Sequence, residues 1–203
     1  MFLLVITGER LLAGAPVTEA SFRKVLFQTV SILTTTGYAT EGLSSPFFGA
    51  AARQVFLVMM VVGGCAGSTS GGVKVLRISI LLRVAAEEVR KLFRADRAIS
   101  GTRYDGALLD RDETERIAGI LFLWVLLLIL GGTVTALLTP GMKEINAASG
   151  MFSALGNIGP CLITQSEMMN LHWGVKITYM IGMLAGRLEI LPVLLLFSRR
   201  AWR

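Results

Sequence analysis

The chain has 203 residues, of which 53% are hydrophobic and 17% charged, and its formal net charge is +6. With a mean hydropathy of +0.64 it is richer in apolar residues than soluble domains usually are, so we expect a membrane protein. Most lysines and arginines lie between 74 and 116 or at 199–203, next to predicted membrane spans. The positive-inside rule places both zones in the cytoplasm, and no aromatic residues interleave with them as base stacking would require. We therefore expect contacts with membrane lipids and no nucleic-acid partner.

Cysteine and histidine are too few for a metal site or a disulfide framework. Cys65 and Cys161 are isolated and His172 is the only histidine of the sequence. We expect neither a bound cofactor nor an enzyme active site.

The first 38 residues predict a short helix that ends in a threonine- and glycine-rich tip. Residues 1–12 are interpreted as the end of a spanning helix whose beginning is missing, and 13–17 as a turn. Thr18 is expected to cap a helix that carries Glu19 in its first turn and ends at Leu33. That helix is shorter than the roughly 20 residues of a bilayer crossing. A re-entrant pore loop fits, with an ordinary helix and turn as the alternative; oxygens lining such a loop suit a dehydrated cation.

A helix from about 47 to 62 then meets a block with five glycines between 63 and 74. So many glycines open a helix, because each costs about 1 kcal/mol relative to alanine in a helix interior. Apolar residues resume at 75–82, so we expect the break to lie within the membrane, facing a cavity. Gly67 and Gly72 have phosphate-loop spacing, but Lys74 does not follow directly and no strand leads in, so a mobile plug is preferred to nucleotide binding.

The second half repeats the same order of elements. Residues 83–116 are interpreted as a charged cytoplasmic connection, or as a docking surface for a partner, and 117–138 as an uncharged span. A turn at 140–141 precedes a second pore helix at 144–155, and 174–197 forms the last span. That span contains Arg187 and Glu189, and a charge inside a span is a functional hypothesis by default. We favour a deep position for Arg187 over a packing ion pair or a snorkelling side chain.

The two predicted tips are similar in sequence. Each has a serine, a leucine two places later and a glycine four places after that, which indicates an internal repeat. The segments are Ser31, Ile32, Leu33, Thr34, Thr35, Thr36, Gly37 and Tyr38, and Ser153, Ala154, Leu155, Gly156, Asn157, Ile158, Gly159 and Pro160.

These two segments, the glycine block 63–74 and the stretch 186–190 together resemble the pore-forming membrane subunit of Trk/Ktr potassium-uptake systems. The resemblance implies an all-α, multi-pass protein of the cytoplasmic (inner) membrane with four helix, pore-loop, helix repeats around one potassium filter. This chain would supply the third repeat (1–98, with a truncated first helix and a broken second helix), a linker (99–116) and the fourth repeat (117–203). Cys161 departs from the family pattern, which usually has glycine there. Two repeats are absent, so we expect a part of a longer or split protein.

The resemblance also implies roles for named residues and partners. The filter set is Thr34, Thr35, Thr36, Gly37, Tyr38, Gly156, Asn157, Ile158 and Gly159, with K⁺ held at Thr35, Thr36, Gly37, Asn157, Ile158 and Gly159. The gating set is Gly63, Gly64, Cys65, Ala66, Gly67, Ser68, Thr69, Ser70, Gly71, Gly72, Lys74 and Arg187. Family members form homodimers and are gated by a cytosolic nucleotide-binding regulatory ring of the TrkA/KtrA kind.

The function expected is potassium transport, either channel-like or by symport with H⁺ or Na⁺. One alternative is a non-transporting assembly or regulatory fragment. A water or small-solute channel is a weaker alternative, since such channels place helix N-termini at the pore centre, whereas here the C-termini lead into the tips.

Overall fold

The structure, a computed structural model, describes residues 1–14, 18–65, 67–68, 70–91, 93, 103–104, 107–108 and 111–187. The predictions that concern Ala66, Thr69, Glu189, the 98/99 boundary and the tail from 188 onward lie outside the described residues.

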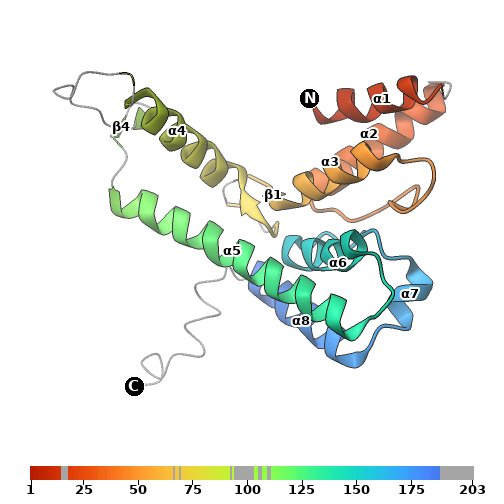
Figure 1. Cartoon of the computed structure of the whole chain (residues 1–203). Helices are drawn as coiled ribbons and strands as arrows, with labels where there is room; N and C mark the ends of the chain where they lie inside the picture. The colour runs from red at the N-terminus through yellow and green to blue at the C-terminus, as the bar shows by residue number, and fades with distance from the viewer. Residues whose placement is uncertain are drawn as a thin grey trace.

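Helices account for most of the described chain (Figure 1). In chain order they are α1 (Phe2–Leu12), α2 (Glu19–Leu33), α3 (Ala50–Val61), α4 (Val75–Lys91), α5 (Arg111–Leu138), α6 (Glu144–Gly156), α7 (Gln165–Met169) and α8 (Trp173–Arg187). Two pairs of two-residue strands correct the all-α prediction in detail: β1 (Val62–Gly63) with β2 (Val73–Lys74), and β3 (Arg103–Tyr104) with β4 (Ala107–Leu108). Helix α5 already begins at Arg111, inside the segment expected to be a linker to 116.

Two apolar clusters meet at α6. The first packs α1, α2 and α3 together around Phe48 and Phe56, and it includes Ile158 from the end of the second predicted tip. The second packs α5, α6 and α8 around Trp124 and Leu155. Because both clusters contact the α6 region, the two halves of the chain lie side by side, with α6 between α3 and the α5–α8 pair (Figure 1).

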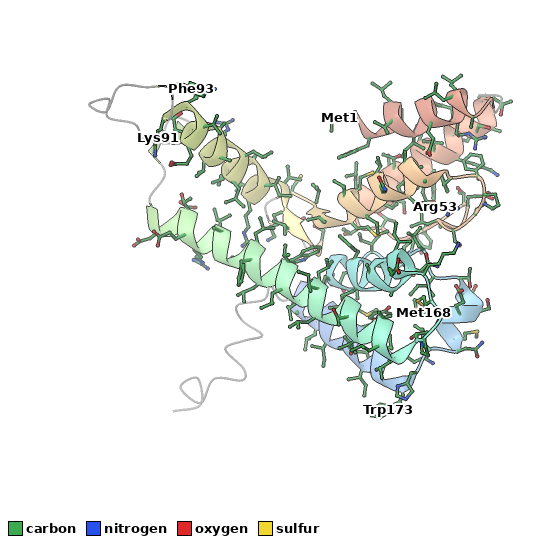
Figure 2. All side chains as sticks on the ribbon, viewed as in Figure 1. Met1, Arg53, Lys91, Phe93, Met168 and Trp173 are labelled. Carbon is green, nitrogen blue, oxygen red and sulfur yellow. The ribbon has the colours of Figure 1, made fainter. Side chains whose placement is uncertain are left out.

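Helix α5 carries the one candidate membrane span among the described residues. Its segment Asp112–Leu138 has 27 residues, and the most apolar 18-residue window within it has a mean hydropathy of 2.6, yet only 22% of that window is buried. Phe122 and Ile129 are more than half exposed on it, which suits a lipid-facing helix better than the core helix of a soluble protein. Figure 2 shows Lys91, at the end of α4, and Trp173, at the start of α8, at opposite ends of the molecule.

Long-range polar contacts fix α1 against α3. The Glu9 carboxylate accepts the backbone N–H groups of Ala51 and Ala52, each at 2.8 Å, and so occupies the positive end of α3. Arg10 donates to the Phe47 carbonyl at 2.7 Å, and its guanidinium lies 3.7 Å from the centre of the Phe47 ring. These contacts hold the segment before Ala50 in a non-helical conformation. Helix α3 therefore begins at Ala50, three residues later than the predicted start at about 47.

Candidate functional site

The first tip is built by the end of α2. Thr18 caps this helix by accepting the Ser21 N–H at 3.3 Å, as expected, and the helix ends at Leu33. Beyond it the Thr36 N–H donates to the Ser31 carbonyl at 2.9 Å, and the Ser31 hydroxyl donates to the Tyr38 carbonyl at 2.5 Å. These bonds fold residues 34–38 back on the last turn of α2, so their carbonyls do not continue the helical ladder.

The second tip has the same construction at the end of α6. The Ile158 N–H donates to the Ser153 carbonyl at 3.1 Å, and the Gly159 N–H donates to the Ser153 hydroxyl at 3.0 Å. A serine on the last turn therefore anchors the tip in both halves of the chain, by its carbonyl and by its hydroxyl.

Backbone angles match between the tips. Counting from each serine, the fourth residue has a positive φ (53° at Thr35, 52° at Asn157), and so has the sixth (84° at Gly37, 105° at Gly159). The left-handed region is uncommon for residues other than glycine, so its recurrence at Thr35 and Asn157 is a shared feature of the turn.

The two tips touch. A Cβ placed on Gly37 would lie 2.0 Å from the Ile158 carbonyl oxygen, and one placed on Gly159 would lie 3.9 Å from the Gly37 carbonyl oxygen. Only glycine fits at 37, because any side chain would occupy the space of a backbone carbonyl. The structure thus brings together two segments that are 122 positions apart in sequence.

The two tips differ in which of their residues are exposed. Tyr38 is 73% exposed, and Thr34 and Thr36 are exposed, whereas Ile158 is buried. The Thr34 hydroxyl donates to the Val30 carbonyl at 2.8 Å and lies 2.8 Å from the Thr36 hydroxyl. Because the Thr34 hydroxyl donates its only proton to the Val30 carbonyl, the Thr36 hydroxyl is the donor in its contact with the Thr34 hydroxyl oxygen.

The glycine block forms a closed loop. Its ends are joined by parallel pairing of Val62 with Val73 and of Gly63 with Lys74. Inside it the Gly64 N–H donates to the Ser70 hydroxyl at 2.7 Å, and the Ser70 and Ser68 hydroxyls lie 2.9 Å apart. Cys65 and Gly67 are exposed, and a Cβ on Gly67 would meet nothing within 4 Å. The break in the helix is therefore a pinned loop with an open outer part.

This loop packs against the end of α6. The Gly72 N–H donates to the Leu155 carbonyl at 3.3 Å. A Cβ on Gly71 would lie 2.5 Å from the Gly156 carbonyl oxygen. From the other side, the Asn157 amide donates to the Met183 carbonyl at 2.9 Å, and a Cβ on Gly186 would lie 2.0 Å from the Leu155 carbonyl oxygen. The second tip is thus held between the glycine block and α8.

Arg187 lies beside the loop. It lines a cavity of about 280 Å³ together with Ser68, Ser70, Gly72 and Lys74. Its side chain is exposed, and its deep position in the membrane stays a prediction. The second tip is thus in direct contact with both the first tip and the glycine block, and Arg187 shares a cavity with the block.

Outside the predicted spans, two loop carboxylates are stabilised in their ionised form. The Lys24 ammonium, 2.9 Å from Glu41, donates a hydrogen bond to this carboxylate and lowers its pKa. Thr164 lowers the pKa of Glu167 in the same way through its hydroxyl and N–H. Thr164 and Glu167 form a capping box on α7, a helix that the sequence analysis did not predict. Its signature, threonine followed by glutamate three residues later, was visible in the sequence.

No group of three or more His, Cys, Asp or Glu side chains suited to a metal ion occurs within the described parts of the chain. Backbone carbonyls and hydroxyls are the oxygen ligands that the tips offer, and such ligands suit alkali and other hard cations.

Comparison with known proteins identifies relatives over the whole chain. The chain matches the TrkH cation transport protein family over residues 1–202. The Trk system potassium uptake protein TrkI of Halomonas elongata is 34% identical over 207 residues, which cover 100% of this chain and 41% of that protein. TrkH of Vibrio parahaemolyticus is 34% identical over 189 residues, covering 90% of this chain and 37% of that protein. The crystal structure of the potassium transporter TrkH from Vibrio parahaemolyticus aligns with a TM-score of 0.82 at 31% identity, covering 100% of this chain and 42% of the other.

The chain spans about two fifths of the length of these relatives. They are named as transport proteins and not as enzymes, in agreement with the interpretation of the sequence. The resemblance suggested by the tips and the glycine block is confirmed, and the chain belongs to the TrkH family of cation transport proteins.

Proposed function

We propose that this chain forms part of a potassium-conducting pathway across the cytoplasmic membrane. The observation that carries the proposal is the contact between the two tips, at Gly37 and Ile158, with matched backbone angles on both sides. Two helices end there, and the negative ends of their dipoles favour a cation at the same place. We infer that the ion is potassium because the relatives TrkI and TrkH are described as potassium uptake proteins.

In the proposed filter, a dehydrated K⁺ exchanges its water for backbone carbonyls of both tips. The carbonyls are those of Thr35, Thr36, Gly37, Asn157, Ile158 and Gly159. Positive φ angles at four of these residues turn successive carbonyls out of the helical direction, which allows several to face one ion. Thr34 and Thr36 hold the rim of the first tip through their hydroxyl contact.

The proposed gate is the glycine block. Its pairing at both ends and its contact with the end of α6 place a closed loop directly against the second tip. In this proposal the Arg187 charge, in the cavity shared with Ser68 and Ser70, repels a cation that leaves the filter and keeps the loop closed by hydrogen bonding. The loop must then move for ions to pass.

The proposal for assembly and regulation rests on the resemblance to the family. We propose a homodimer whose charged cytoplasmic segment 83–116 contacts a nucleotide-binding regulatory ring. The ion is cargo in this proposal, and the chain needs no resident cofactor.

The test is ion flux through the full-length protein in liposomes, measured with potassium or rubidium. Arg187→Ala, or a deletion within residues 64–71, is expected to raise the flux because it weakens the closed state. Unchanged or lower flux in a variant that folds normally contradicts the gate. Absence of any flux in the full-length wild-type protein supports the non-transporting alternative.

A further inference from the structure

A second cavity, which borders the proposed gate at Gly67 and Lys74, lies between α4 and α5. It has a volume of about 280 Å³ and is lined by Lys74, Arg77, Arg116 and Glu113 together with apolar side chains of both helices. Three cations and one carboxylate give this lining a net positive charge. Helix α4 lies beside the first turns of α5 (Figure 1), and the cavity lies between these two helices.

The lining of α5 changes from charged to apolar along the helix. Glu113, Arg116, Ile117 and Ile120 follow one another at helical spacing and face the cavity. Ile117 and Ile120 are 6% and 4% exposed, while Glu113 and Arg116 are exposed. The midpoint of Glu113 and Arg116 lies four residues before the midpoint of Ile117 and Ile120. At a rise of about 1.5 Å per residue, this separates the charged part of the lining from the apolar part by about 6 Å along α5. The charged end coincides with the start of the predicted span, where headgroups meet acyl chains.

We infer that this cavity binds the phosphate of an anionic phospholipid in the cytoplasmic leaflet. Basic cavities between membrane helices on the cytoplasmic side are suited to acidic headgroups. A phosphate at the level of Arg116 and Arg77 would direct its acyl chains along Ile117 and Ile120. An arginine has five N–H donors, so binding does not require that either guanidinium lack other partners.

The charge pattern favours a lipid over a free phosphate. A free phosphate or a nucleotide carries more than one negative charge and would meet Glu113 in the same cavity without any gain from the apolar side. A phosphodiester lipid carries one charge and uses both sides of the lining. The two sources share the same chemistry at the arginines, and competition separates them.

The experiment uses the full-length protein in detergent and measures retention of phosphatidylglycerol by native mass spectrometry. Arg116→Gln is expected to weaken lipid binding about fivefold, the effect of one basic residue near an acidic headgroup. The matched control is Arg90→Gln, which removes the same charge from the exposed far part of α4 and is expected to leave binding unchanged. Glu113→Gln removes the repulsive carboxylate and is expected to tighten binding.

Three results overturn the inference. An equal loss of phosphatidylglycerol binding in Arg116→Gln and Arg90→Gln would mean that binding depends only on the overall charge of the protein. Unchanged binding for both Arg116→Gln and Glu113→Gln would place the lipid elsewhere. Displacement of phosphatidylglycerol by millimolar inorganic phosphate, with Arg116→Gln weakening phosphate binding equally, would assign the cavity to a free anion. Phosphatidylcholine serves as the neutral lipid and is expected to be retained equally by all variants.

Discussion

Replacement of Gly37 by alanine tests the contact on which the proposed filter depends. The added Cβ would stand 2.0 Å from the Ile158 carbonyl oxygen, whereas real Cβ contacts essentially never fall under 3.0 Å. The carbonyl of the second tip, or the whole first tip, must therefore move by about 1 Å or more. In addition, residue 37 has φ of 84°, and a left-handed conformation costs an L-residue about 1–2 kcal/mol.

Both consequences are measurable in the full-length protein. The strain is expected to lower the apparent melting temperature, by less than the about 2–4 °C per kcal/mol of a 150–250-residue domain because the full-length protein is longer. The displaced carbonyl is expected to reduce the preference for potassium over sodium by about tenfold, if some 1.4 kcal/mol of coordination is lost. Competition of sodium with rubidium uptake in liposomes reads out the second effect, and thermal unfolding in detergent reads out the first.

Gly42→Ala is the matched control. It adds the same methyl group to the loop after the first tip, where the nearest atom is the Ser44 hydroxyl oxygen at 3.9 Å. This variant is expected to keep both stability and ion preference. If Gly37→Ala lowers the melting temperature but leaves ion competition unaltered, the tip contact is structural and the filter assignment is refuted.

Two further predictions concern polar contacts at the starts of α3 and α7, outside the tips. Glu9→Gln should destabilise the protein by about 1–2 kcal/mol, since the carboxylate holds two N–H groups at the start of α3, whereas Glu19→Gln, at an exposed side chain, should have little effect in the same melting assay. The lowered pKa of Glu167 means that the stability it contributes is fully present above its ordinary value of 4.5 and is lost as the pH falls through the lowered pKa. The difference in melting temperature between wild type and Glu167→Gln should therefore shrink below pH 4.5, and a difference that grows on acidification would contradict this assignment.

Local signals made the ends of the helices predictable from sequence. Thr18 and Glu19 mark the start of α2, and α6 begins at Glu144, about where the sequence predicts it. The end of α6 extends one residue beyond Leu155, to Gly156. The start of α2 is set by the side-chain cap of Thr18, so nearby residues suffice to predict it, whereas α6 has no side-chain cap at Lys143.

Contacts between distant segments were not predictable in this way. The parallel pairing of Val62 with Val73 involves two residues on each side, too few to produce a strand period. The position of Glu9 at the start of α3 depends on how α1 and α3 pack. No local sequence pattern indicates which distant residues a glutamate in a helix will contact. The likeness between the tips indicated that both belong to one site, but only the fold places Gly37 against Ile158.

The glycines that pack against the end of α6 are required for the same physical reason, and this reason is relevant to gating. At Gly71 and Gly186 a side chain would occupy the place of a backbone carbonyl of Gly156 or Leu155. A carbonyl in the last turn of a helix cannot swing aside as a side chain can, so the loop and α8 approach this helix end at backbone distance. The Leu155 carbonyl, which has no partner further along the helix, accepts the Gly72 N–H instead. If the loop opens as proposed, that carbonyl needs a new donor, and the same helix end carries the second tip. The proposed gate and the proposed filter therefore share one set of hydrogen-bonding groups, so that movement of the loop changes the support of the filter.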